Sequence, residues 1–195
     1  MGRVTPRPPP PDHDLLERRE IADAPSISRT LRRMALEIAE LVPSDERPFY
    51  IVGVRTGGAF LAGRLTRMLV EAGEPAPALG AVDISLYRDD VFHGLPKPEI
   101  GPTELPEPIQ GRTIVLVDDV LYTGRTIRAA MDVLADYGRP KAVKLAVLVD
   151  RGRRELPIQP DVVGVQLDTT AAQSVRVMLA ERGEPDRVVL RERRP

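Results

Sequence analysis

The sequence predicts an α/β domain with a central, mainly parallel sheet that is flanked by helices. Short apolar runs at residues 49–54, 113–117 and 143–149 alternate with segments in which apolar residues recur every three or four positions. This alternation is typical of strand–helix–strand units with right-handed crossovers and parallel pairing. The length of 195 residues is sufficient for about one domain with a sizeable core.

The chain is expected to begin with a flexible tail over residues 1–24, followed by the folded domain over residues 25–195. The tail contains a run of prolines, which favours an extended polyproline conformation, and it lacks the apolar segment of a secretory signal. No run reaches the roughly 18 apolar residues of a membrane span. We therefore expect a cytoplasmic protein without a membrane partner.

The first helix is expected to begin near Ser26, with Ser26 or Ser28 as its cap, and to end before Pro43. Its apolar residues have helical spacing: Ile27, Leu31, Met34, Ile38 and Leu41. A buried strand over residues 49–54 follows, and a glycine-rich turn leads from it into a helix over residues 59–72.

The middle of the chain is expected to contain a strand over residues 81–86 and then a long loop. Residues 88–111 carry charges and five prolines with little periodicity. A loop of this length in a compact domain is usually functional or disordered, and we expect a mobile active-site loop.

The clearest strand is predicted at residues 113–117, and a helix is expected from Arg125 to Tyr137, where Gly138 ends it. Another strand over residues 143–149 leads into a small hood at about residues 150–168. Residues 174–179 and 187–191 flank a polar turn, which predicts a β-hairpin at the end of the domain.

Composition excludes several classes of site. The chain has no cysteine and only two histidines, so disulfides, thiolate catalysis and a zinc site built from these residues are not expected. Any metal should be held by oxygen atoms. The net charge of −1 does not match a non-specific nucleic-acid binder, although a local basic face is compatible with it.

Residues 115–126, VLVDDVLYTGRT, join a buried strand to the start of a helix. The backbone N–H groups near Gly124 and the hydroxyls of Thr123 and Thr126 can surround a phosphate at the positive end of the helix. Asp118 and Asp119 lie one short loop away, where their oxygens can accept hydrogen bonds from two sugar hydroxyls. This pattern favours a phosphorylated sugar as ligand.

Three other interpretations fit part of this pattern. A strand that ends in two acids occurs in Walker-B sites, but the chain has no Gly-Lys dipeptide and so no Walker-A loop. A receiver-domain acidic pocket does not explain the Thr-Gly-Arg-Thr that follows. The third interpretation is that the two acids only cap a helix.

Together, four blocks of sequence resemble the type I phosphoribosyltransferases, and among these the PyrR family of pyrimidine-operon regulators and uracil phosphoribosyltransferases. The blocks are VGVRTGG at residues 52–58, VDISLYRDD at 82–90, VLVDDVLYTGRT at 115–126 and LAVLVDRGRRELPI at 145–158. The resemblance covers the domain from about Ser26 to Pro160 and implies the type I phosphoribosyltransferase fold.

The resemblance implies transfer of ribose 5-phosphate from phosphoribosyl diphosphate (PRPP) to uracil, giving UMP and diphosphate, with Mg²⁺ as cofactor. Asp118, Asp119 and Arg88 would be catalytic, and Mg²⁺ would be held through the substrate, with Asp118 as a candidate ligand. The remaining site residues implied for PRPP and its 5-phosphate are Val115, Leu116, Val117, Val120, Leu121, Tyr122, Thr123, Gly124, Arg125 and Thr126. The diphosphate loop would be Arg55, Thr56, Gly57 and Gly58, and the uracil hood would include Val149, Asp150 and Arg151.

Members of this family also bind the leader RNA of pyrimidine operons in the presence of UMP and promote transcription termination, and a homodimer or larger homo-oligomer is implied. The candidate RNA contacts here are Arg32, Arg33, Arg153 and Arg154; ordinary solvated charge explains them equally well. Several positions depart from the family pattern, and these departures put RNA binding in doubt: Leu36, Arg153, Gln159 and Val165. Gly57 replaces an arginine of the diphosphate loop, so we expect catalysis to survive with altered diphosphate affinity or altered subunit contacts.

Two alternatives to a bifunctional enzyme remain open. One is an RNA-binding regulator with little catalysis, and the other is a phosphoribosyltransferase for another base, such as orotate or a purine. Purine relatives have an aspartate where Tyr122 stands, which favours a pyrimidine.

Overall fold

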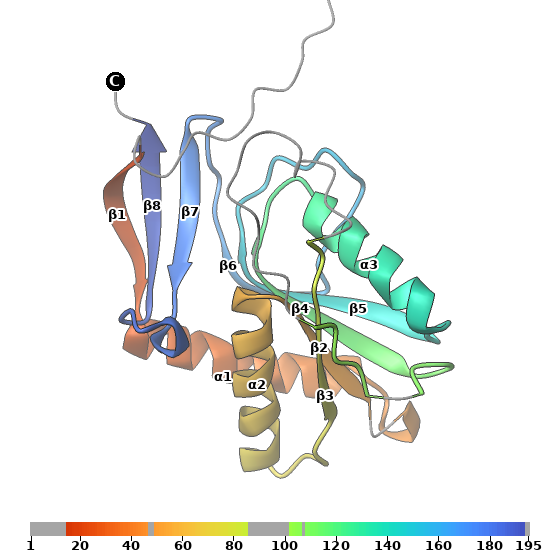
Figure 1. The fold of residues 1–195 in the computed structure, drawn as a ribbon. Coiled ribbons are helices and arrows are strands. Elements are labelled where there is room, and N and C mark those ends of the chain that lie inside the picture. The colour runs from red at the N-terminus through yellow and green to blue at the C-terminus, as the bar shows by residue number, and fades with distance from the viewer. Residues whose placement is uncertain (1–14, 47–48, 86–101, 107, 194–195) are drawn as a thin grey trace, which may run out of the picture.

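The computed structural model describes residues 15–46, 49–85, 102–106 and 108–193, and these form two sheets and three α-helices (Figure 1). A five-stranded parallel sheet has the strand order β3-β2-β4-β5-β6, and a three-stranded antiparallel sheet has the order β1-β8-β7. The strands are β1 (Leu15–Asp23), β2 (Tyr50–Val54), β3 (Ala78–Val82), β4 (Thr113–Leu121), β5 (Ala142–Asp150), β6 (Val162–Gln166), β7 (Gln173–Met178) and β8 (Arg187–Arg193). The helices are α1 (Ala24–Leu41), α2 (Gly57–Glu71) and α3 (Arg125–Tyr137), with short 3₁₀ turns η2 (Ser44–Glu46) and η3 (Ala180–Arg182). The α/β architecture and the parallel sheet are confirmed.

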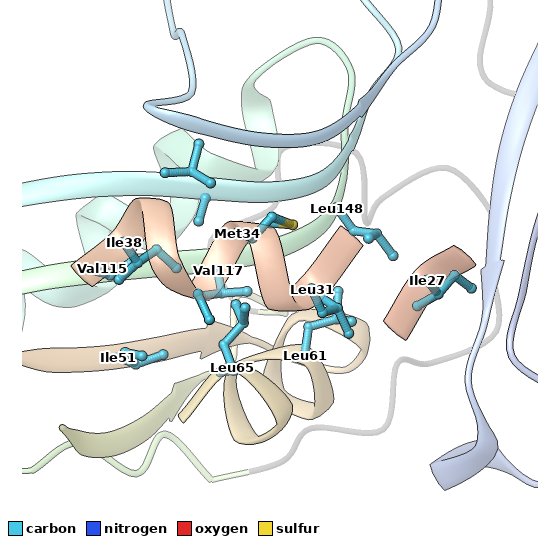
Figure 2. Packing of buried hydrophobic residues seen from close by; sticks show 14 of the residues in the cluster. Ile27, Leu31, Met34, Ile38, Ile51, Leu61, Leu65, Val115, Val117 and Leu148 are labelled. Atoms are coloured by element: carbon cyan, nitrogen blue, oxygen red, sulfur yellow. The ribbon is translucent and has the colours of Figure 1, made fainter. Parts of the chain in front are cut away.

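The parallel sheet is covered on both faces, as expected for strands that are apolar along their whole length. Helices α1 and α2 cover one face, where Leu31 and Leu65 pack beside Val115 and Val117 (Figure 2). Helix α3 covers the other face, and its Ile127 and Val133 share a cluster with Leu116. The carboxyl ends of the strands are therefore left open to the loops. Among the described residues, no helix is both long and apolar enough to cross a membrane.

Strand β1 corrects the expected extent of the N-terminal tail. Residues 15–23 pair antiparallel with β8, and only residues 1–14 of the expected tail lie outside the described residues. Four consecutive charged residues, 17–20, conceal this strand in the sequence because they break the apolar–polar alternation. Arg187 pairs with Glu17 and Glu20, so part of the charge supports the strand pairing.

The start of α1 also differs from the expected one. Asp23 caps the helix by accepting a hydrogen bond from the backbone N–H of Ser26 at 3.0 Å, and Pro25 lies in the first turn. Ser26 is therefore inside the helix rather than at its cap. Asp23 ends β1, so one residue closes the strand and starts the helix.

The second part of the expected mobile loop is packed against the domain. Glu104 forms an isolated antiparallel bridge with Ala81, and Ile109 is buried in the core. The hydroxyl of Tyr50 donates to the carbonyl of Pro108 at 3.1 Å. Residues 86–101 and 107 lie outside the described residues.

Three more elements differ from the prediction. Strand β4 is longer than expected and continues through Asp118 and Asp119 to Leu121. Strand β6 lies within the residues expected for the hood, but it forms the edge of the parallel sheet. The predicted strand at residues 81–86 is instead β3 at Ala78–Val82. The C-terminal hairpin of β7 and β8 is confirmed.

The C-terminal hairpin is joined to α2 through one arginine. Arg64 forms two-point hydrogen bonds with Glu181 and with Asp186, at 2.5–2.9 Å, and its side chain is 14% exposed. These hydrogen bonds lower the pKa of both carboxyls and raise the pKa of Arg64. The network fixes η3 beside α2.

We predict that Arg64→Met lowers the free energy of unfolding by about 1–3 kcal/mol at neutral pH, because two partly buried carboxylates lose their partner. The pKa values of Glu181 and Asp186 in the folded protein lie below their ordinary values of 4.5 and 3.8. This stabilisation is therefore complete above those values and is lost as the pH falls through the folded-state pKa. Denaturant unfolding of both proteins between pH 7 and pH 2 checks this. A difference that stays constant down to pH 2 would contradict the assignment.

Candidate active site

Two carboxylates lie at the carboxyl end of β4. Asp118 is 5% exposed, and its Oδ1 accepts a hydrogen bond from the backbone N–H of Asp119 at 2.9 Å. Burial raises the pKa of Asp119, while hydrogen bonds from the backbone and the charge of Arg182 oppose the rise. Asp119 is therefore held partly out of water, and its oxygens are suited to a polar ligand.

Three glycines bring the N-terminus of α2 against these acids. A Cβ atom on Gly57 would lie 2.2 Å from Oδ2 of Asp119, and one on Gly58 would lie 2.3 Å from the carbonyl oxygen of Val117. A Cβ on Gly53 would lie 2.4 Å from the Cα of Ala59. Only residues without a side chain allow this approach, so the backbone at the start of α2 borders the carboxylate of Asp119.

The loop between β2 and α2 starts with Arg55. Its backbone N–H donates to the carbonyl of Val82 at 2.9 Å, and its guanidinium lies 3.4 Å from a carboxylate oxygen of Glu104. The peptide bond between Arg55 and Thr56 is cis. Thr56, at the N-cap of α2, makes no side-chain capping hydrogen bond. The first N–H groups of a helix have no partner within the helix, so this end of α2 offers donors to a ligand.

The turn between β4 and α3 provides a second helix N-terminus. Gly124 stands at the cap position with φ of 92°, a left-handed conformation that glycine adopts without strain. Gly124 has no side chain with which to cap α3, and the hydroxyl of Thr123 accepts a hydrogen bond from the backbone N–H of Arg125 at 3.4 Å. The N-terminus of a 13-residue helix with this geometry attracts an anion.

The hood is bonded to this turn mainly through backbone atoms. The N–H groups of Glu155 and Leu156 both donate to the carbonyl of Thr123 at 3.0 Å. The N–H of Arg151 donates to the carbonyl of Leu121 at 3.1 Å. In addition, Arg125 pairs with Glu155 at 2.8 Å. The hood and the turn thus form one connected unit.

A small open cavity of about 320 Å³ lies between these two segments. It is lined by Tyr122, Arg153, Arg154, Glu155 and Ala171. The cavity lies next to the turn that starts α3, so a molecule bound at that turn can extend toward the hood.

The side chains of the predicted hood residues are used inside the protein. Asp150 accepts hydrogen bonds from the N–H of Gly152 at 2.9 Å and from Arg154 at 2.7 Å. Val149 is buried in the core. Arg151 lies over the ring of Tyr122, 3.9 Å from the ring centroid.

The apolar members of the predicted phosphate-binding block have structural roles. Their side chains fill the core on both faces of the sheet or, for one of them, pack partly buried against it: Val115, Leu116, Val117, Val120 and Leu121. The polar members, from Tyr122 to Thr126, form the turn described above. Arg88 lies outside the described residues.

Three of the four candidate RNA contacts make internal hydrogen bonds. Arg33 donates to the carbonyls of Val163 at 2.9 Å and Gly164 at 2.6 Å. Arg154 donates to the carbonyls of Tyr122 at 3.0 Å and Ile158 at 2.9 Å, as well as to Asp150. Arg153 adopts φ of 60° and donates to the carbonyl of Thr169 at 3.4 Å. Arg32, Arg33 and Arg153 are exposed, whereas Arg154 is half-buried.

Sequence reasoning missed residues that support the site from elsewhere in the chain. Thr169 is buried and hydrogen-bonded to Arg151, and Glu104 pairs with Arg55. The polar stretch at residues 168–170 after the hood was the available signal for Thr169. No local pattern marks Glu104, because its partner is distant in sequence.

Together these features suit an anionic sugar ligand. The N-termini of α2 and α3 can each receive an anion, and two carboxylates can accept hydrogen bonds from hydroxyls. The carboxylates lie at the end of β4, which leads directly into the turn that starts α3. A ligand that carries hydroxyls and two separate anionic groups satisfies this arrangement.

Comparison with known proteins identifies relatives over most of the chain. Residues 17–182 match the phosphoribosyl transferase domain family. The chain is 47% identical over 174 residues to the bifunctional protein PyrR of Syntrophobacter fumaroxidans, with 89% of this chain and 93% of that protein covered. It is also 47% identical over 175 residues to the bifunctional protein PyrR of Streptomyces coelicolor, with 89% and 90% covered.

Solved structures share the fold at low sequence identity. The hypoxanthine phosphoribosyltransferase of Trypanosoma cruzi aligns with a TM-score of 0.67 at 17% identity, covering 91% of this chain and 98% of that one. A hypoxanthine-guanine phosphoribosyltransferase of Bacillus anthracis aligns with a TM-score of 0.62 at 19% identity, covering 90% and 99%. At these identities the likeness concerns the fold alone.

We predict that Gly58→Ala lowers the free energy of unfolding by about 1–3 kcal/mol, because the new methyl group meets the backbone of β4 and α2 must shift. Gly63→Ala in the same helix is the matched control, since no atom lies within 4 Å of a Cβ there. That control should be stabilised by up to about 1 kcal/mol through helix propensity. Equal stabilities of the two variants in denaturant unfolding would show that the close approach is absent.

Proposed function

This chain belongs to the phosphoribosyl transferase domain family and, within it, to the bifunctional PyrR proteins, and from that premise we propose that it makes UMP and diphosphate from uracil and PRPP. In this reaction N1 of uracil forms a bond to C1 of the ribose. The bond between C1 and the diphosphate oxygen breaks, diphosphate leaves with the electron pair, and N1 loses its proton. Positive charge grows on the ribose ring as the leaving group departs.

The contact between Gly57 and Asp119 carries this proposal. It joins a helix N-terminus, which favours the negative diphosphate, to an acid that can accept a hydrogen bond from a ribose hydroxyl. Asp118 accepts from the neighbouring hydroxyl. Because both carboxylates also lie near the sugar, their charge stabilises the positive ring in the transition state.

The 5-phosphate occupies the turn that starts α3, where Thr123 and Thr126 supply hydroxyls and Gly124 lets the backbone approach. Arg125 borders the same turn. Arg55, the first residue of the diphosphate loop, adds a cation there. These groups orient the donor and hold it without covalent chemistry.

The acids also fit a role for Mg²⁺. The described residues contain no group of three or more Asp, Glu, His or Cys that could hold a metal ion alone, and Mg²⁺ is often held by one or two carboxylates plus phosphate oxygens. Asp118 and Asp119 would border such an ion, which when bound with PRPP neutralises the charge of the leaving diphosphate.

Uracil lies beneath the hood and is recognised mainly by backbone groups, since the side chains of Asp150 and Arg151 are committed to contacts within the protein. Assays with PRPP and Mg²⁺ in which uracil, orotate and hypoxanthine are offered in turn test the choice of base. UMP formation from uracil alone is the expected result, and turnover of orotate or hypoxanthine in place of uracil would contradict it.

A second activity, UMP-responsive binding of pyrimidine leader RNA that regulates operon expression, is favoured by the similarity to proteins named bifunctional PyrR. Arg154 is half-buried and supports the hood, so the exposed candidates for this surface are Arg32, Arg33 and Arg153. Of these, Arg33 also donates to carbonyls of β6, and Arg153 donates to the carbonyl of Thr169.

We predict that the double variant Asp118→Asn, Asp119→Asn lowers the rate of UMP formation by about 100-fold or more, because the ribose loses two ionised acceptors and the ring loses its counter-charge. We expect the variant to fold, because burial disfavours the charged form of Asp119 and the substitution to asparagine removes that charge. Steady-state kinetics and thermal unfolding measure the two effects. Asp132→Asn on the exposed side of α3 is the control with parental turnover; parental turnover in the double variant would refute the assignment.

We predict that Arg32→Ala and Arg153→Ala each weaken binding of a pyrimidine leader RNA in gel-shift titrations with UMP, while Arg128→Ala on α3 does not. Loss of a phosphate contact reduces the salt dependence of the affinity as well. If the parent protein produces no shift at physiological salt with or without UMP, the enzyme activity stands alone.

A further inference from the structure

The Arg151–Tyr122 stack joins the hood to the turn that starts α3. Arg151 follows the last residue of β5 and lies at the start of the hood, and Tyr122 follows the last residue of β4. The guanidinium carbon lies 3.9 Å from the centroid of the ring, within the range of a cation–π contact. Arg151 is only 6% exposed, so water weakens this contact little.

The remaining donors of Arg151 fix the orientation of its guanidinium plane. Nη2 donates to the carbonyl of Gln173 at 2.6 Å, and Nε donates to the hydroxyl of Thr169 at 3.1 Å. The same hydroxyl donates to the carbonyl of Arg151 at 3.0 Å. These partners belong to the loop between β6 and β7 and to the start of β7. The plane over Tyr122 is therefore set by a third segment of the chain.

Tyr122 is held on its backbone as well as on its ring. Its carbonyl accepts a hydrogen bond from Arg154 at 3.0 Å, and the carbonyl of the preceding residue, Leu121, accepts from the N–H of Arg151 at 3.1 Å. The carbonyl of the next residue, Thr123, accepts hydrogen bonds from two backbone N–H groups of the hood. A shift of the hood thus moves Tyr122 together with the rest of the turn that starts α3, residues 122–126, which we call the phosphate turn.

We infer that Arg151 is a positioning residue that acts through Tyr122: it does not bind the base, but it sets the phosphate turn and the hood in register, so that the 5-phosphate and uracil bind cooperatively. This inference rests on the proposed function of the site. A planar guanidinium is required, because it must stack on the ring while it donates in plane to two oxygens. Lysine keeps the charge but cannot do both. Burial lowers the pKa of Arg151, and the charge of Arg153 acts in the same direction.

The test is a cross-effect on Michaelis constants. Arg151→Lys, in the hood, should raise the KM for PRPP, and Tyr122→Leu, in the phosphate turn, should raise the KM for uracil, each by about 3- to 30-fold. The double variant should resemble the more affected single variant rather than show the product of the two effects. Tyr122→Phe should restore the KM for uracil toward the parental value, because the ring is kept. Arg128→Lys, an exposed arginine of α3, is the matched control with parental constants.

Two outcomes would overturn the inference. If Arg151→Lys raises only the KM for uracil, Arg151 is a ligand of the base. If the effects of the two single variants multiply in the double variant, the stack is not the connection. Thermal unfolding is measured for every variant, and Tyr122→Leu carries the test if Arg151→Lys does not fold.

Calorimetric binding of ribose 5-phosphate separates this inference from the proposed function. If the parent protein forms no UMP but Arg151→Lys still weakens binding of ribose 5-phosphate, the positioning role holds and the proposed reaction fails. If UMP forms and Arg151→Lys leaves that binding unchanged, the reaction holds and the positioning role fails.

Discussion

The close approach of α2 to β4 is the constraint on which the site depends. Gly53, Gly57 and Gly58 have no side chains, and this allows the helix start to lie directly on the strand that carries the two acids. The approach brings a positive helix end and a carboxylate into contact, and burial of that carboxylate raises its pKa. The carboxylate of Asp119 is thus held against the start of the helix rather than in open solvent.

On the opposite side of the site, hydrogen bonds rather than close packing at glycines hold the segments together. There the hood and the phosphate turn are connected by backbone hydrogen bonds to the carbonyls of Leu121 and Thr123, and by the arginines of the hood, which mostly contact oxygens of the protein. Side chains that resembled ligands in the sequence, such as Asp150 and Arg154, are used to maintain the shape of the hood. Base selection by such a hood depends on backbone geometry, which many sequences can produce.

The parts of the structure that local periodicity determines were predictable. The buried strands β2, β4 and β5 and the helix α3 follow from apolar runs and from the glycine that ends α3, and the sequence also places the two acids and the turn after them between β4 and α3. The parts that depend on distant partners were not predictable. Strand β1 is stabilised by β8, and the guanidinium of Arg33 donates to carbonyls of β6. In each case the deciding contact joins residues more than a hundred positions apart, for which a single sequence contains no signal.

The pairing of β1 with β8 has a consequence for the order of folding. An ion pair between these strands joins residues 170 positions apart, so nearly the whole chain must be closed into a loop before the contact forms. Closing this loop costs entropy, and the cost falls once the parallel sheet and its helices have assembled, because they bring the two strands close together. The pairing of β1 with β8 is accordingly a late step in folding, and β1 is the first place where amide hydrogen exchange should report local opening.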